Sequence, residues 1–179
     1  MAGSLVKLDT ATASSSASVT LTGITSDYNT CILYWVDVLA GTDGADLQAR
    51  FTEGGSPNTN SNYNGAVSYP RSDRSFVDNN NDNLGLGDRD QMGLTGSTSS
   101  TANRGHHGSM YITLAANGSE PTFAQNKNVY LASGGGNEML GNFGGWVLRE
   151  GTTVDGVQLY FDSSSNIAQG DFVLYGIKK

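Results

Sequence analysis

The chain has 179 residues, of which 24 are glycine and 15% are charged, and its formal net charge is −7. This length fits one domain, and frequent Gly, Ser, Thr and Asn disfavour helix because they compete with helical backbone bonding. The ten Lys and Arg are scattered, so no basic cluster predicts contact with a nucleic acid backbone. We expect one all-β domain, residues 1–179, that binds no nucleic acid.

Two features of the sequence indicate the cellular compartment in which the protein is made. Cys31 is the sole cysteine, so no disulfide can form within the chain, and its apolar neighbours predict an inert buried thiol. Residues 1–7 contain no apolar stretch of signal-peptide length, and no run of about 20 apolar residues could span a bilayer. We expect a protein that is made in a cytoplasm, stays soluble and has no membrane partner.

The first predicted strands are residues 18–22, closed by Gly23, and residues 30–39. The second strand carries apolar side chains on both faces, with Ile32, Tyr34, Val36 and Val38 on one and Cys31, Leu33 and Trp35 on the other. Such a strand is either covered on its outer side by a loop or faces a neighbouring subunit, and both alternatives stay open. Turn residues 41–44 and a third strand, residues 47–51, predict that the second and third strands form a hairpin.

Residues 53–107 form a long loop-rich excursion, in which Gly, Ser, Asn and Asp interrupt every regular pattern. So long an irregular stretch inside a domain is unusual and often functional. It is the predicted place for partner-specific contact.

Regular alternation returns at residues 110–114, 129–131, 146–148, 157–161 and 172–177. Short strands between Gly-rich turns, with no amphipathic helical window, favour an antiparallel sheet over a parallel α/β sheet. The predicted fold is an all-β, antiparallel, jelly-roll-like β-sandwich with long irregular loops.

Several segments resemble a family of virion structural or tail fibre proteins of tailed phages that infect aquatic bacteria. These segments are ASSSASVTLTGI (13–24), SDY (26–28), GTDGADLQARF (41–51), VQLYF (157–161), SNIAQG (165–170) and FVLYGIKK (172–179). The resemblance covers both ends of the chain and is loose over residues 53–107; it depends on the order and spacing of short motifs. It implies a β-sandwich on a virion surface, often trimeric, and it carries over no catalytic residue.

Asp78, Asn80 and Asp82 resemble the opening of a calcium loop, because alternate positions supply side-chain oxygens. The sixth position is Asn83 where Gly is expected, and the twelfth is Arg89 where a bidentate Glu is needed. We interpret this run as a surface turn and predict no metal site.

His106 and His107 are adjacent, so in a strand their side chains would point to opposite faces and could not chelate one ion. The sequence favours an exposed loop pair over a metal held by one His from each of three chains on a threefold axis.

Other candidate sites also have structural interpretations. Glu138, Glu150, Asp155 and Asp162 lie in turn-like settings without a nucleophile or a facing carboxylate, so we predict no catalytic residue and no enzyme. Residues 134–136 (GGG) lack a following Lys-Ser or Lys-Thr and are interpreted as a turn, so no cofactor is expected.

The aromatic residues leave two interpretations. Trp35, Trp146 and the eight tyrosines could stack on sugar rings where exposed, but strand aromatics are more often found in cores or interfaces. Arg71 and Arg74 flank Asp73, and either pairing with an acidic neighbour or a solvated loop explains them.

The first hypothesis for function is a capsid decoration (cement) protein on the virion surface, made in the host cytoplasm. Its expected partners are copies of itself, as a homotrimer, and the major capsid protein or another virion protein. The alternative is a tail fibre or receptor-binding module that recognises a host surface glycan. A glycoside-cleaving depolymerase would need two carboxylates facing one cleft and is disfavoured.

Overall fold

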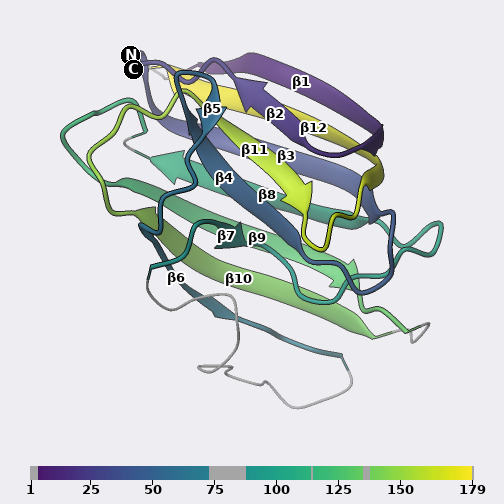
Figure 1. Cartoon of the computed structure of the whole chain (residues 1–179). Coiled ribbons are helices and arrows are strands. Elements are labelled where there is room, and N and C mark those ends of the chain that lie inside the picture. The colour runs from purple at the N-terminus through teal and green to yellow at the C-terminus, as the bar shows by residue number, and fades with distance from the viewer. Residues whose placement is uncertain (1–3, 73–87, 114, 135–137, 179) are drawn as a thin grey trace.

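The computed structural model describes residues 4–72, 88–113, 115–134 and 138–178, which form two antiparallel sheets (Figure 1). The large sheet has the order β1 (Leu5–Ser16), β12 (Ile167–Lys178), β3 (Tyr28–Ala40), β8 (His106–Thr113), β9 (Thr122–Leu131), β10 (Met139–Leu148) and β6 (Tyr63–Ser68). The small sheet has the order β2 (Val19–Thr22), β11 (Gly156–Phe161), β4 (Leu47–Glu53) and β5 (Ser56–Pro57), with β7 (Met92–Gly93) also paired to β4. The described residues include no helix long and apolar enough to cross a membrane.

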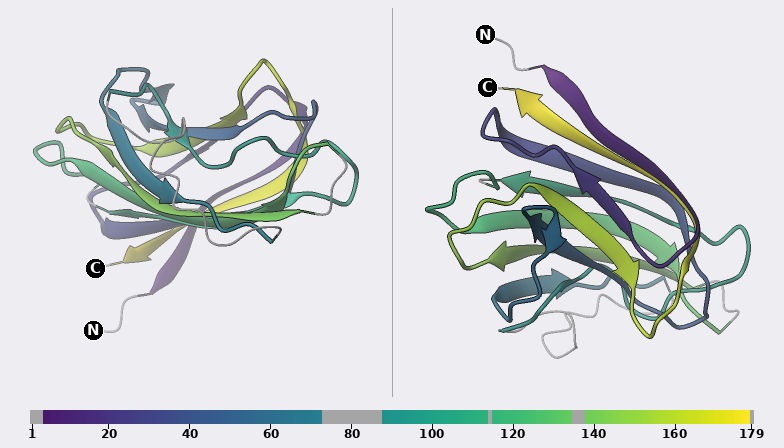
Figure 2. Two further views of the ribbon diagram at one scale, coloured as in Figure 1. Left: turned by 90° about the horizontal axis from the view of Figure 1, so that it is seen from below. Right: turned by 45° about the horizontal axis from the view of Figure 1, so that its top comes forward.

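The two sheets lie face to face as two layers (Figure 2), and the chain passes repeatedly from one to the other, although β8, β9 and β10 follow one another within the large sheet. β1, β3 and β12 belong to the large sheet, whereas β2, β4 and β11 belong to the small one, and the first strand pairs with the last. This winding is that of a jelly roll, so the predicted fold class is confirmed. The first and last described residues consequently lie side by side (Figure 1), and the Lys178 amide donates to the Ser4 carbonyl at 3.0 Å.

The predicted hairpin between residues 30–39 and 47–51 is wrong. β3 pairs with β12 and β8, and β4 pairs with β11 in the other sheet. The reason is that residues 41–44 carry the chain across from one layer to the other. There the Gly41 amide donates to the Asn166 carbonyl at 2.8 Å, and Gly44 has a positive φ of 87°.

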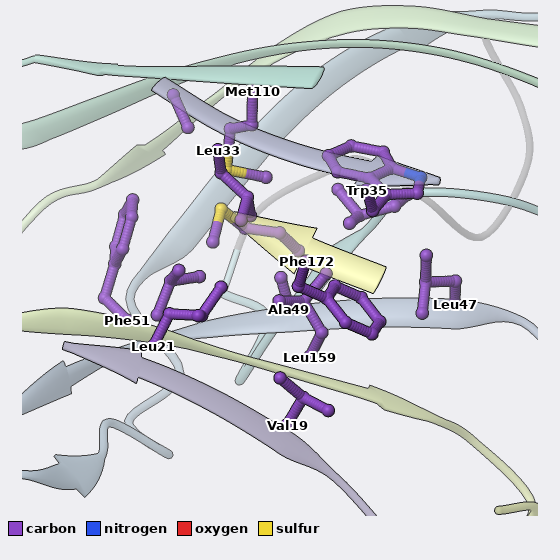
Figure 3. Packing of buried hydrophobic residues seen from close by; sticks show 14 of the residues in the cluster. Val19, Leu21, Leu33, Trp35, Leu47, Ala49, Phe51, Met110, Leu159 and Phe172 are labelled. Atoms are coloured by element: carbon purple, nitrogen blue, oxygen red, sulfur yellow. The ribbon is translucent and has the colours of Figure 1, made fainter. Parts of the chain in front are cut away.

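The core lies between the inner faces of the two sheets. Figure 3 shows Leu33, Trp35 and Met110 of the large sheet facing Phe51 and Leu159 of the small one. All of these side chains are at most 1% exposed. Because removal of a buried large side chain typically costs about 2–5 kcal/mol, this layer supplies much of the stability of the fold.

A β-bulge interrupts the alternation of β3. Asp37 has a positive φ of 53°, and the register with β8 shifts between Trp35 and Val38. Val38, which strict alternation places on the face of Tyr34, is therefore turned inward and is fully buried. The predicted position of Val38 is wrong for this reason.

The described parts of the excursion belong largely to the sandwich. β6 extends the edge of the large sheet, and residues 92–99 cover the inner face of β9. Leu94, Thr95 and Thr98 are fully buried, and the Leu94 carbonyl accepts a hydrogen bond from Asn128 Nδ2 at 2.7 Å. The predicted partner contact therefore has no support from residues 92–99, and residues 73–87 lie outside the described residues.

Candidate functional site

The most unusual surface is the outer face, which we define as the face of the large sheet that points away from the small sheet. Among the described residues, the exposed large hydrophobic side chains all lie in strands of this sheet, and strand register places them on its outer face. They are Leu5, Tyr34, Val36, Tyr111, Phe123, Val129, Met139 and Ile177. Exposed apolar side chains that gather on one face of a sheet are typical of an interaction site.

The central strand β3 accounts for part of this face. Its inner side chains, such as Leu33 and Trp35, are buried in the core. On the outer side Tyr34 is 38% exposed and Val36 is 52% exposed. Among the described residues, no loop buries these two side chains.

Three tyrosines gather beside β3 on the outer face. Tyr34 and Tyr175 meet edge to face, with ring centroids 6.2 Å apart and planes inclined at 76°. Desolvation by burial, followed by the charge of Tyr111 and a hydrogen bond with it, raises the pKa of Tyr34 above its ordinary value. We call Tyr34, Tyr111 and Tyr175 the tyrosine cluster; it offers both ring faces and hydroxyls to a partner.

A groove of about 1160 Å³ lies on the other half of the outer face, over β6, β8, β9 and β10. We call it the outer groove. Gly145 and Ala66 are opposite each other on neighbouring strands and form a floor of small residues. Phe123, Lys127 and Phe143 also line it, so the groove combines aromatic rings with one cation.

The structure describes only part of the calcium-like run at residues 78–89. Asp78, Asn80, Asp82 and Asn83 lie outside the described residues, whereas Arg89 is described and its backbone pairs with Tyr63. The described residues contain no group of three or more His, Cys, Asp or Glu that could hold a metal ion.

His106 and His107 open β8 and point to opposite faces, as predicted for a strand. The prediction of an exposed loop pair is wrong for His106, which is fully buried against Tyr130, 5.3 Å away between ring centroids, and Phe161, 5.7 Å away. Desolvation, with a smaller contribution from the charge of His107, lowers the pKa of His106 to about 3. His106 is thus a neutral core side chain near neutral pH.

The four carboxylates considered as catalytic candidates make structural hydrogen bonds at turns and sheet edges. Their partners are Arg71 at 2.5 Å for Glu138, Asn62 at 2.9 Å for Glu150, Thr52 at 2.6 Å for Asp155 and the Asp46 amide at 2.9 Å for Asp162. Arg71 therefore has an acidic partner, whereas Asp73 and Arg74 lie outside the described residues.

The tryptophans and the thiol are in the interior. Trp35 is 1% exposed and Trp146 is 3% exposed, so neither can stack on a sugar at the surface. Cys31 is buried as predicted, and desolvation raises the pKa of its thiol to about 11, which keeps it unreactive. Gly134, with a φ of 82°, lies in the connection between β9 and β10, and residues 135–136 lie outside the described residues.

Comparison with known proteins adds no further constraint. A scan against protein-family models, a search of curated proteins and a search of solved structures each found no match. Interpretation of the outer face therefore depends on the residues themselves.

Sequence reasoning missed the outer groove. The signal that could have found it is the alternation of residues 122–131, in which Phe123, Gln125 and Lys127 all share one face. Only residues 129–131 of this strand were predicted, because Asn126 and Asn128 stand at the buried positions where an apolar residue is expected.

Proposed function

We propose that this chain is a non-enzymatic structural protein of a phage virion, a capsid decoration protein that assembles as a homotrimer on the particle surface. The observation that carries the proposal is the exposed apolar outer face beside β3, where Tyr34 and Val36 are 38% and 52% exposed. Aromatic and aliphatic side chains in one patch are typical of the buried centre of a protein interface. In this proposal the β1, β12 and β3 part of the outer face contacts neighbouring copies.

The resemblance to phage virion proteins supplies the setting of the proposal. A decoration protein, made in the host cytoplasm, adds buried area over contacts between subunits of the major capsid protein or another virion protein. The net charge of −7 favours solubility at the high local density of a particle surface. Neither trimer formation nor binding to other virion proteins requires a catalytic group.

The first test is the oligomeric state together with the copy number on particles. Light scattering of the purified protein should give the mass of a trimer, and a quantitative gel of purified virions should give hundreds of copies per particle. A monomer at every concentration contradicts self-assembly. A few tens of copies per particle contradicts decoration and favours the receptor-binding alternative.

A matched pair of variants locates the interface. Val36→Ser removes an apolar side chain beside the tyrosine cluster, so it should weaken association, whereas Val129→Ser makes the same change on β9 and should not. Val36 and Val129 are 52% and 39% exposed, so neither change creates a core cavity. Equal association of the two variants would place the interface elsewhere.

A further inference from the structure

The floor of the outer groove is a glycine that the backbone does not require. A Cβ atom added at Gly145 would have the Ala124 carbonyl oxygen as its nearest neighbour, at 3.5 Å, which is an ordinary contact. The adjacent Gly144 differs, because its Cβ would lie 2.3 Å from the Ala66 carbonyl oxygen. Glycine inside a strand weakens it and often marks a position where a ligand approaches the backbone closely. Gly145 thus keeps a hollow open.

Large side chains border this hollow on both sides. Phe143 and Val147 point to the same face as Gly145 on β10 and stand about 14 Å apart along the strand. On β9, Phe123 is 47% exposed and lies opposite Val147, whereas Gln125 lies opposite Gly145. An exposed ring beside an amide suits a ligand that has apolar faces and hydroxyl groups, as a sugar ring does.

The charge of the groove indicates the charge of the ligand that it could bind. Lys127 lies opposite Phe143, with its Nζ 5.7 Å from the centre of that ring, and is the sole charged side chain among the described residues that line the groove. It forms no salt bridge with any described residue, although the chain has a net charge of −7. A cation without an acidic partner, in an acidic protein, is complementary to an anionic ligand.

We infer that the outer groove binds an anionic saccharide of the uronate class. The exposed ring of Phe123 and the half-buried ring of Phe143 pack on the sugar, Gln125 hydrogen-bonds its hydroxyls, and Lys127 pairs with its carboxylate. This inference does not depend on the proposed function, because the groove centres on β9, β10 and β6, whereas the proposed interface lies on β1, β12 and β3. Tyr111 of β8 belongs to the tyrosine cluster and also lines the edge of the groove.

The test is a calorimetric titration of the purified protein with hexagalacturonate and, for comparison, with neutral maltohexaose. Wild-type protein should bind the uronate at least tenfold more tightly than the neutral sugar, and binding should weaken as salt is added. Lys127→Ala should bring the two affinities to within about threefold of each other. Absence of hexagalacturonate binding, or equal affinity for the two sugars, would overturn the inference.

The Gly145→Val variant tests most directly whether the outer groove is the binding site. It should fill the hollow and weaken hexagalacturonate binding at least tenfold, while the melting temperature stays the same or rises, because a β-branched residue suits a strand better than glycine. Val129→Ser, on the same face of the sheet but outside the groove, is the control and should bind within twofold of wild type. Wild-type affinity in a folded Gly145→Val protein would exclude the groove as the site.

The failure of this inference can be told apart from failure of the proposed function. Val36→Ser should change association and leave hexagalacturonate affinity unchanged, whereas Gly145→Val should do the reverse. If Gly145→Val instead dissociates the oligomer, the occupant of the groove is a second copy of the chain and the saccharide inference is wrong.

Discussion

His106 is a titratable group in a place that admits only its neutral form. Two aromatic rings, Tyr130 and Phe161, pack against it, and its side chain is fully buried. A buried imidazolium has no solvent to stabilise its charge, which is why the pKa falls from 6.5 to about 3. Protonation of this residue is therefore coupled to unfolding.

The sign of the resulting pH dependence follows from proton binding. Between about pH 6.5 and pH 3 the unfolded chain binds a proton at His106 that the native state does not bind, so stability falls as the pH falls through this window. We expect a loss on the order of 3 kcal/mol between pH 7 and pH 4 from this residue. Urea denaturation of wild type and His106→Leu at both pH values measures it.

The comparison isolates the contribution of His106. Carboxylates titrate in both proteins, so their effect on the free energy of unfolding cancels in the difference. His106→Leu should lose less stability on acidification than wild type, whereas His107→Gln, which changes an exposed neighbour, should behave as wild type does. Identical pH dependence of wild type and His106→Leu would show that His106 is not responsible.

At the level of elements, β9 and β10 bring amide side chains into the core. Asn126 and Asn142 are 1% and 0% exposed, and the Asn126 Nδ2 donates to the Asn142 Oδ1 at 2.8 Å. A buried amide that loses its partner keeps the cost of desolvation, whereas replacement of both amides by apolar groups removes that cost. The two strands are thus coupled through this pair.

A double-mutant cycle tests the coupling. Asn142→Leu alone should destabilise the protein by about 1–3 kcal/mol, because it leaves the Asn126 amide without this hydrogen bond. The double variant Asn126→Leu/Asn142→Leu should cost less than the sum of the two single changes, as measured by urea denaturation. Strict additivity would mean that the two amides do not depend on each other.

Several strands could be predicted from the sequence, and the reasons for the misses are local. The strands at residues 18–22, 30–39 and 47–51 alternate in polarity, and all three are confirmed as β2, β3 and β4. β1 was missed because its Thr, Ala and Ser residues hide the alternation, although its register with β12 is continuous apart from one bulge. The bulge at Asp37 could not be predicted, because it is defined by the pairing of β3 with β8 and β12, which are distant in the chain.

At the scale of the whole molecule, the sequence predicts the jelly-roll class from many short strands, but not which strands share a sheet. Pairing of β3 with β12 and β8 depends on contacts between segments more than 60 residues apart in the chain, and no local pattern encodes them. The outer face was missed as a site for a related reason. Its exposed side chains come from six strands, and the fold alone brings them together.

Self-association through the outer face makes a prediction for stability. If trimers bury the surface around Tyr34 and Val36, mass action favours the folded state as protein concentration rises. We expect the melting temperature of wild type to rise with concentration over a hundredfold range, measured by calorimetry. Val36→Ser should lose most of this dependence and melt at nearly the same temperature throughout. A wild-type melting temperature independent of concentration would argue against an obligate oligomer.

The pairing of β1 with β12 has a consequence for how the protein is made. Strand β12 lies between β1 and β3, so β1 has no partner in the large sheet until β12 has left the ribosome. A nascent chain must therefore keep a 12-residue edge strand unpaired during most of its synthesis. The Thr, Ala and Ser residues that make β1 hard to recognise also make it a poor template for aggregation during this interval.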